Sequence, residues 1–341
     1  MEEETAFWGQ LLMVGIPGPR MDPVARELVR DLRVGGVILF ARNIESPAQV
    51  WELNRDLQQE ALAAGKRPLL IAADQEGGTV QRLKTPFTII PPARELGAAA
   101  TPEQVERLAQ KVARELALVG LNVNLAPVLD VARGPQCPLW DRSYSPDPER
   151  VALMGTAAIR GYLTGGVIPT AKHFPGLGDT VIDSHQDLAL AESGQTHREM
   201  DLLPFRRAAA AGVPMMMTAH LLVPEWDPHR PATLSRKILQ GKLREEVGFD
   251  GVIITDDLEM GAISRGLEVA PAAREALAAG ADLLLICNNF QGAWDAARLL
   301  ARDESLIPLA REAAARLDRL REGVRVGAAD LSEVKEYFSN Q

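Results

Sequence analysis

The stretch GVIITDD, residues 251–257, is a short apolar run that ends abruptly in two carboxylates. Seven other runs rich in Val, Ile, Leu or Met recur along the chain, and each is bounded by Gly, Pro or a polar residue. They are LLMVGIP (11–17), GVILF (36–40), PLLIAAD (68–74), LNVNLAP (121–127), VIPTAKH (167–173), PMMMTAH (214–220) and ADLLLIC (281–287). Near-continuous apolar runs, without polar alternation, are typical of parallel strands buried on both faces. The sequence therefore predicts eight parallel strands.

Segments of helical character separate most of these runs. The clearest is TPEQVERLAQKVARELALVG (101–120), in which Thr101 is a suitable cap, Gln104 closes a capping box and Gly120 supplies the stop. Further helical segments occupy 20–35, 195–212, 234–248, 271–280 and 304–323. Strands that alternate with helices favour an α/β fold of the (β/α)₈ TIM-barrel type, ahead of an open doubly wound sheet. The length of 341 residues fits one barrel or two modest domains.

Composition and charge limit the partners and the compartment. The chain is 46% hydrophobic, and its net charge of −9 argues against a nucleic-acid partner, because such proteins concentrate Lys and Arg on one face. No segment reaches the roughly 18 apolar residues that a membrane span needs. The acidic N-terminus lacks the basic start of a signal peptide. Cys137 and Cys287 have no CxxC spacing, so neither a disulfide framework nor a zinc site is indicated. We expect a cytoplasmic protein.

Polar residues gather at the ends of six predicted strands, where a barrel carries its functional groups. They are Arg42, Asn43, Asp74, His173, His220, Asp256 and Asn288. Polarity must resume at any strand end, so a single such residue carries little weight. Six aligned strand ends together indicate a functional face.

The segment AKHFPGLGDTVIDSH (171–185) continues the fifth run into a loop, because its Pro and Gly residues oppose a helix. Asp183 and His185 are separated by one residue, so both side chains project from one face of an extended segment. A carboxylate beside an imidazole favours the protonated ring, which prepares a general acid. The alternatives are a loop Asp beside a surface His, and a metal-ligand pair, which predicts loss of activity with chelators.

His173 follows Lys172 at the end of the fifth run. Adjacent strand residues point to opposite sides, so only one of them faces the barrel axis unless the strand already twists into the loop. Polar groups at this place suit the hydroxyls of a sugar. The alternative for Lys172 is a buried charge paired with a neighbouring Asp.

Asp256 is the best nucleophile candidate, because it directly follows an apolar strand. Alternation turns Asp257 in another direction, so we assign Asp256 to the pocket and Asp257 to the structure. A carboxylate can attack a carbon that bears a good leaving group and so form a covalent intermediate.

DQEGGTVQRL (74–83) places Asp74 at a strand end and then two glycines, which allow close backbone approach. It lacks the spacing of a nucleotide-binding loop. Arg82, and Arg142 in DRSYSPDP, have the geometry to clamp a carboxylate or bridge sugar hydroxyls. Surface salt bridges are the alternative for both.

With these stretches, the chain resembles the single-domain β-N-acetylhexosaminidases of glycoside hydrolase family 3. The matching blocks, in the family's order, are LFARNIES, DQEGGTVQRL, NLAPVLDV, DRSYSPDP, AKHFPGLGDTVIDSH, MMMTAHLLVPEWDP and GVIITDDLEM. The resemblance implies one barrel domain over residues 1–341 with its core from about 10 to 325. It also implies hydrolysis of terminal β-linked N-acetylglucosamine with retention, from cell-wall muropeptide fragments, by an enzyme without metal or organic cofactor. We expect a monomer with no membrane partner.

The resemblance also assigns roles to residues. It implies that Asp256 is the nucleophile and that His185 is the acid/base with Asp183 as its dyad partner. The implied sugar-binding residues are Asp74, Arg82, Arg142, Lys172 and His173. The chain departs from the family pattern at Leu177 where FPGHG is usual, at Ala189 where DSHxxLP is usual, and at RSYS in place of RSFG.

Two further functions remain open from the sequence. One is a β-glycosidase of other specificity, or a glycoside phosphorylase, on the same barrel, since a neutral His repels phosphate less than Glu does. The other is a barrel that binds sugar without turnover.

Overall fold

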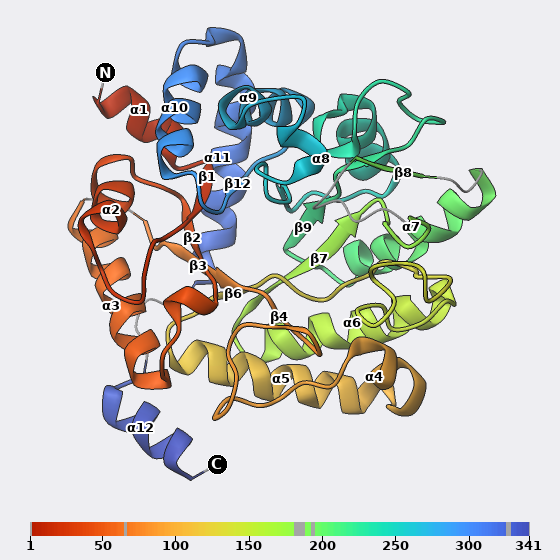
Figure 1. Ribbon diagram of the computed structural model, residues 1–341, viewed down its shortest axis with the longest axis horizontal. Helices are drawn as coiled ribbons and strands as arrows, with labels where there is room; N and C mark the ends of the chain where they lie inside the picture. The colour runs from red at the N-terminus through yellow and green to blue at the C-terminus, as the bar shows by residue number, and fades with distance from the viewer. Residues whose placement is uncertain (1, 65–66, 181–187, 192–194, 325–328, 341) are drawn as a thin grey trace.

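All eight apolar runs form strands of one parallel sheet (Figure 1). The computed structural model describes residues 2–64, 67–180, 188–191, 195–324 and 329–340. In this part of the chain the strands are β1 (Leu12–Gly15), β2 (Gly36–Leu39), β3 (Leu70–Ala73), β6 (Val123–Asn124), β7 (Ile168–Phe174), β9 (Met215–Thr218), β11 (Val252–Ile254) and β12 (Leu284–Ile286). Apart from the half-buried Ile168, all of their residues are buried, which explains why the runs are continuously apolar.

The sheet closes into a barrel. The strands follow one another in chain order from β1 to β11, and β12 returns to pair in parallel with β1. On its other side β12 meets β11 through a bridge between Ile254 and Leu283 and a hydrogen bond of 2.9 Å from Thr255 N to Leu283 O. Because the first and last strands are joined, the (β/α)₈ prediction is confirmed and the open doubly wound sheet is wrong.

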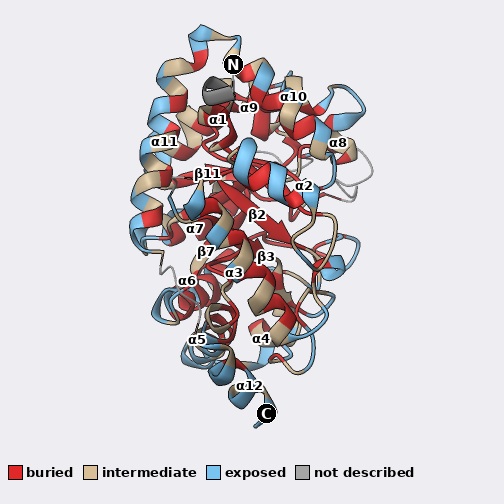
Figure 2. Cartoon of the chain, turned by 90° about the vertical axis from the view of Figure 1, so that its left-hand side faces the viewer, coloured by how far each residue is buried: buried red, intermediate tan, exposed pale blue. Residues whose placement is uncertain are grey.

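Helices surround the sheet and expose their outer faces, while the strands stay buried (Figure 2). In the described residues they are α1 (Glu2–Gly9), α2 (Pro23–Arg26) with the π-helical turn η1 (Glu27–Asp31), α3 (Pro47–Ala63), α4 (Ala93–Ala99), α5 (Pro102–Leu118), α6 (Pro148–Thr164), α7 (Gln195–Ala210), the π-helix η4 (Lys237–Glu246), α8 (Gly261–Ser264), α9 (Val269–Ala279), α10 (Phe290–Ala301), α11 (Ile307–Glu322) and α12 (Leu331–Ser339). None of the helices in the described ranges is both long and apolar enough to cross a bilayer.

The boundaries of α5 follow the predicted signals. Gln104 N donates to Thr101 Oγ1, and Thr101 N donates to Gln104 Oε1, which together form the predicted capping box. Gly120, just beyond the helix end, has a φ of 84°, a left-handed conformation that favours glycine. Local chemistry therefore decides where this helix begins and ends.

Two small two-stranded sheets lie on the face of the barrel at the strand ends. The hairpin of β4 (Gln75–Gly77) and β5 (Val80–Gln81) follows β3, and β8 (Ala189–Leu190) pairs in parallel with β10 (Leu221–Leu222). A Cβ on Gly77, whose φ is 118°, would lie 2.7 Å from Ile90 Cγ2 and from Pro91 O. The diglycine therefore permits the predicted close approach, but to the chain's own segment after the hairpin.

Candidate active site

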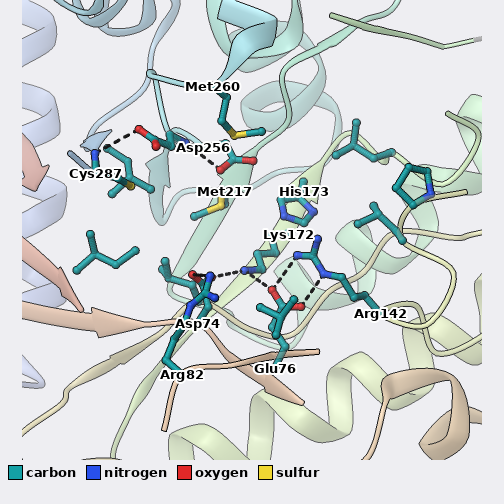
Figure 3. A pocket seen from close by; sticks show the side chains of 18 of the residues that line it. Asp74, Glu76, Arg82, Arg142, Lys172, His173, Met217, Asp256, Met260 and Cys287 are labelled. Carbon is teal, nitrogen blue, oxygen red and sulfur yellow. Dashed lines mark hydrogen bonds and ion pairs between the residues drawn. The ribbon is translucent and has the colours of Figure 1, made fainter. Parts of the chain in front are cut away.

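A cavity of about 240 Å³ opens at the carboxyl ends of the strands (Figure 3). Its wall draws on residues in or directly after β2, β3, β7, β9, β11 and β12. Six of the predicted site residues line it, namely Asp74, Arg82, Arg142, Lys172, His173 and Asp256. The other two, Asp183 and His185, lie outside the described residues. Residues far apart in the sequence thus meet where a barrel is expected to hold its site.

Lys172 is the centre of the charged wall. Its Nζ lies 2.7 Å from Asp74 Oδ1 and 2.6 Å from Glu76 Oε1, and the side chain is only 2% exposed. Burial opposes the ammonium charge, but the two carboxylates outweigh it and raise the pKa of Lys172. Burial likewise opposes the charge on Asp74, yet Lys172 and Arg82 hold its pKa well below the usual range. The alternative reading of Lys172, a buried charge paired with Asp, describes its contacts correctly, and the residue also borders the cavity.

Two arginines extend this network. Arg142 forms a bidentate pair with Glu76, with Nε–Oε2 and Nη2–Oε1 distances of 2.8 Å. Arg82 Nη2 donates to Asp74 Oδ2 at 3.2 Å. Both guanidinium groups are partly buried in the cavity wall, so they are not the surface salt bridges of the alternative reading. The result is a wall rich in hydrogen-bond donors and acceptors.

Glu76 is a site residue that the sequence analysis missed. It lies two positions after Asp74 in the DQEGG stretch, and side chains two apart share a face of an extended segment. The same alternation that was applied to Asp183 and His185 would have found it.

His173 also lines the cavity, beside Lys172. The register between β7 and β9 shifts between Ala171 and Phe174, so simple alternation fails at this strand end. His173 Nδ1 lies 2.7 Å from Asp130 Oδ2. Because a carboxylate only accepts, Nδ1 carries a hydrogen and donates it to Asp130.

Asp130 is a second residue that was missed, since it follows the predicted strand 121–127 by three positions. It is fully buried and accepts from the backbone N of His173 at 3.2 Å and of Leu177 at 2.6 Å. This carboxylate therefore holds both the histidine and the start of the loop that follows it. Leu177, one of the departures from the family pattern, contributes its side chain to the cavity wall.

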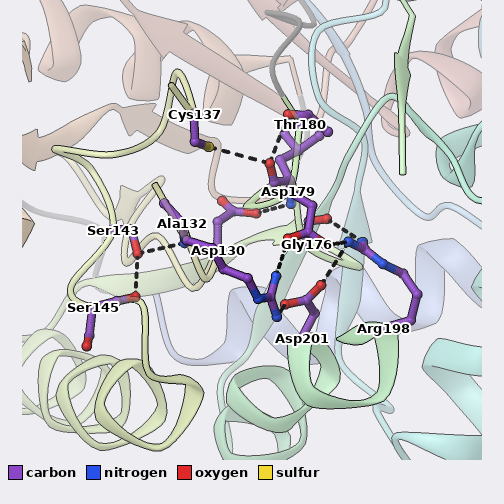
Figure 4. A network of polar contacts seen from close by, with 12 residues as sticks. Asp130, Ala132, Cys137, Ser143, Ser145, Gly176, Asp179, Thr180, Arg198 and Asp201 are labelled. Carbon is purple, nitrogen blue, oxygen red and sulfur yellow. Dashed lines mark hydrogen bonds and ion pairs between the residues drawn. The ribbon is translucent and has the colours of Figure 1, made fainter. Parts of the chain in front are cut away.

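An ionic network anchors the same loop (Figure 4). Asp179 pairs with both Arg133 and Arg198, and these arginines pair with Asp201 at 2.6 and 3.1 Å respectively. Arg198 also donates to Gly176 O at 3.2 Å. Burial raises the pKa of Asp201 to about 6, although both arginines oppose the shift. The chain is thus held firmly up to residue 180, at the edge of the described segment.

Asp256 and Asp257 follow β11 on another side of the cavity. Asp256 Oδ1 accepts from Asp257 N at 2.8 Å. Asp257 Oδ1 accepts from Cys287 N at 3.3 Å and from Glu259 N at 3.2 Å. Burial, with Glu259 as the next cause, raises the pKa of Asp257 to about 7. The contacts of Asp257 are structural, as expected, but its side chain also borders the cavity.

Four of the strand-end residues, Arg42, Asn43, His220 and Asn288, are not among the residues that line the described cavity. Arg42 donates to Ile16 O at 2.9 Å, to Cys287 O at 2.9 Å and to Asn288 Oδ1 at 2.8 Å. Asn43 is fully buried and donates to Ile16 O at 3.1 Å. Arg42, Asn43 and Asn288 therefore tie loops together, so the strand-end pattern overpredicts the site.

The rest of the cavity wall is largely apolar, which the sequence analysis did not foresee. Its residues include Phe40, Val80, Leu139, Leu177, Met217 and Met260. An apolar side facing a charged side suits a ligand with both a carbon skeleton and hydroxyl groups.

Comparison with known proteins agrees with this geometry. The family profile described as the glycosyl hydrolase family 3 N-terminal domain matches residues 5–319. A β-hexosaminidase of Pseudomonas aeruginosa is 41% identical over 282 residues, which cover 82% of each chain. A β-hexosaminidase of Nitrosomonas eutropha is 39% identical over 307 residues, covering 88% of this chain and 87% of the relative.

Solved structures show a likeness to the same family. A glycoside hydrolase family 3 β-N-acetylglucosaminidase from a Paenibacillus species superposes with a TM-score of 0.91 at 39% identity, covering 98% of this chain and 68% of that chain. A β-N-acetylhexosaminidase from Beutenbergia cavernae superposes with a TM-score of 0.88 at 30% identity, covering 94% of this chain and 98% of that chain. With the profile match over most of its length, the closed barrel and the cavity at its strand ends, the chain belongs to glycoside hydrolase family 3.

Proposed function

We propose that this glycosidase is a retaining β-N-acetylhexosaminidase that removes terminal β-linked N-acetylglucosamine, with Asp256 as its nucleophile. The observation that carries the proposal is the position of Asp256 in the cavity, on a different wall from the ion network around Lys172. A sugar held by that network leaves its anomeric carbon within reach of a carboxylate on the other side.

The charged wall suits a neutral sugar. Each hydroxyl both donates and accepts, so it needs carboxylate acceptors beside ammonium or guanidinium donors. Asp74 and Glu76 supply the acceptors, while Lys172, Arg82 and Arg142 supply the donors. The cavity of about 240 Å³ is smaller than the roughly 300–1,000 Å³ typical of sites for larger ligands. It therefore favours one terminal sugar residue.

The reaction proceeds in two displacements. A carboxylate oxygen of Asp256 bonds to the anomeric carbon while the bond from that carbon to the leaving oxygen breaks. Water then attacks the glycosyl ester from the opposite side, so the configuration is retained overall. The hydrogen bond from Asp257 N to Asp256 Oδ1 keeps the attacking group oriented during both steps.

We assign the proton transfers to His185 with Asp183, on the basis of the family motif. His173 has a different setting: its Nδ1 hydrogen is bound to Asp130, and the residue lines the cavity beside Lys172. We therefore assign His173 to contacts with sugar hydroxyls.

We infer that the substrates are muropeptide fragments of the cell wall, cleaved in the cytoplasm by a monomer. The two cysteines, Cys137 and Cys287, are free and buried, which fits a reducing compartment. Family membership and the names of the relatives support the N-acetylglucosamine preference.

Covalent trapping tests the proposal. An activated N-acetylglucosaminyl donor with fluorine on ring carbon 5 slows both displacements, because fluorine destabilises the electron-poor transition state. We expect a stoichiometric adduct located on Asp256 by peptide mass spectrometry. A bound sugar without any adduct would favour the non-catalytic barrel, and an adduct on another residue would refute the assignment of the nucleophile.

A panel of aryl β-glycosides tests the specificity. We expect faster cleavage of the N-acetylglucosaminide than of the glucoside or xyloside. Repeating the assay with added phosphate separates a hydrolase from a phosphorylase, because only a phosphorylase yields the sugar 1-phosphate.

A further inference from the structure

His220 is a fully buried histidine next to the site, and the proposed mechanism has so far given it no part. It lies between β9 and β10, close to the short helix η3 (Ala232–Leu234). It is not among the described residues that line the cavity, so it does not reach a bound sugar. Any effect on the reaction must therefore act through another residue.

Both ring nitrogens of His220 are occupied by neighbouring groups. Nε2 lies 2.9 Å from Asp257 O, and Nδ1 lies 2.8 Å from Thr233 Oγ1. A backbone carbonyl only accepts, so Nε2 carries a hydrogen and donates it to Asp257 O. Thr233 Oγ1, the partner of Nδ1, donates to Ala219 O at 3.0 Å and lies 2.8 Å from Thr218 Oγ1. This side of the ring is therefore tied to the end of β9.

The carbonyl that His220 holds belongs to the residue after the nucleophile. Asp257 O accepts a second hydrogen bond from Met260 N at 3.0 Å, so the turn after β11 closes on this atom. The same residue donates its N–H to Asp256 Oδ1 at 2.8 Å. Asp257 is also held through its side chain, by Cys287 N at 3.3 Å. The orientation of the Asp256 carboxylate thus depends on how firmly Asp257 is fixed.

We propose that His220 is a positioning residue for the nucleophile: its Nε2–H fixes the carbonyl of Asp257, which keeps the Asp257 N–H directed at the carboxylate of Asp256. The inference rests on the proposed function, because it takes Asp256 as the nucleophile. His220 follows β9, and the carbonyl to which it donates follows β11, the neighbouring strand of the barrel. It therefore couples the turn that carries the nucleophile to the rigid sheet.

The test compares two replacements of His220. His220→Met keeps an unbranched side chain of similar volume but has no donor, whereas His220→Gln has an amide N–H that can reach the carbonyl. The matched control is His229→Met, since His229 is exposed and away from the cavity. For each protein we measure kcat and KM on an aryl N-acetylglucosaminide, the rate of adduct formation on Asp256 with the 5-fluoro donor, and Tm.

We expect His220→Met to lower kcat and the rate of adduct formation by about 30- to 100-fold, with KM within about threefold of the wild type, because a misplaced reacting group costs up to about 10²-fold. His220→Gln should recover at least tenfold of that loss, and His229→Met should equal the wild type. Thr233→Val is the second variant in case His220→Met fails to fold. It removes the partner of Nδ1 and should lower kcat about three- to tenfold at unchanged KM.

Other results overturn the proposal. Equal losses in His220→Met and His220→Gln, in step with a lower Tm, would mean that the ring only fills space. An unchanged kcat in a folded His220→Met, or in Thr233→Val if the first variant does not fold, would remove His220 from the reaction. Failure of the wild type to form an adduct on Asp256 would instead overturn the proposed nucleophile, and with it the premise of this inference.

Discussion

The carboxylates on the two sides of the cavity have different partners. On the charged wall, Asp74 and Glu76 are paired with Lys172, Arg82 and Arg142. On the wall after β11, Asp256 forms no ion pair with any described residue and accepts instead from a backbone N–H. Paired carboxylates are held in place and suit recognition, whereas a carboxylate without a bound cation keeps its lone pairs for a new bond. This difference supports the proposal that one wall of the barrel holds a sugar and the other attacks it.

The strongest test of this difference removes Asp256, the carboxylate without a cationic partner among the described residues. We expect Asp256→Ala to lower kcat by about 10⁴-fold or more, because the change removes the proposed nucleophile and with it the proposed covalent intermediate. Stopped assays with an aryl N-acetylglucosaminide measure the loss. Added azide should restore turnover of an activated substrate and give the α-glycosyl azide, since the small anion takes the place of the missing side chain. Residual activity above about one per cent would argue for a different nucleophile.

A second change breaks the charged wall. Lys172→Met leaves Asp74 and Glu76 without the cation between them, and breaking a buried pair costs about 3–5 kcal/mol. We expect kcat/KM to fall by about 10²- to 10³-fold and Tm to fall as well. Lys237→Met, on the surface, is the matched control and should change neither value. A kcat/KM within threefold of the wild type would show that the network does not hold the substrate.

Asp257, the neighbour of the proposed nucleophile, gives a prediction about pH. The pKa of Asp257 is raised from 3.8 to about 7 in the folded protein, because burial disfavours its charge. Between these values the unfolded chain releases the proton that the folded chain retains, so the wild type loses stability as pH rises. Asp257→Asn has no such proton. From about pH 4 to 7 the free energy of unfolding of Asp257→Asn should therefore rise relative to that of the wild type, by up to about 4 kcal/mol. Above about pH 7 the difference between the two proteins should stay constant.

Urea unfolding of both proteins across this pH range measures the effect. Other carboxylates titrate in both and cancel in the difference. Curves that run parallel from pH 4 to 8 would mean that Asp257 is ionised throughout.

The smallest expected effect distinguishes the two arginines of the charged wall. Arg142 makes a bidentate pair with Glu76, whereas Arg82 makes one hydrogen bond of 3.2 Å to Asp74. Lysine keeps the charge but not the fork geometry. We expect Arg142→Lys to raise KM about tenfold and Arg82→Lys about threefold, both with kcat little changed. Equal effects in steady-state assays would mean that charge alone matters at this wall.

Much of the site could be predicted because strand ends are visible in the sequence. Four residues at or beside predicted strand ends, Asp74, Lys172, His173 and Asp256, meet in one cavity, where Lys172 reaches Asp74 across 98 positions of the chain. Arg82 and Arg142 also line it, but the family resemblance assigned them to the site. The incorrect site predictions arose because the position of a residue at a strand end does not reveal its hydrogen-bond partners. Arg42 and Asn43 lie at such an end yet tie loops together, and Asp130 lies beyond its run. A residue's polarity is local, but its partner is decided by which strands become neighbours.

The amino-acid sequence by itself determined the eight strands and the cap of α5, because burial on both faces and capping both depend on residues close together in the chain. Only the tertiary structure decided that Lys172 lies between two carboxylates and that His220 holds the residue after Asp256. These contacts need a closed barrel, which brings distant strand ends to one face. Apolar patterning requires only that both faces of the strands are covered, whereas hydrogen-bond partners are selected by distances that exist only after the strands have met.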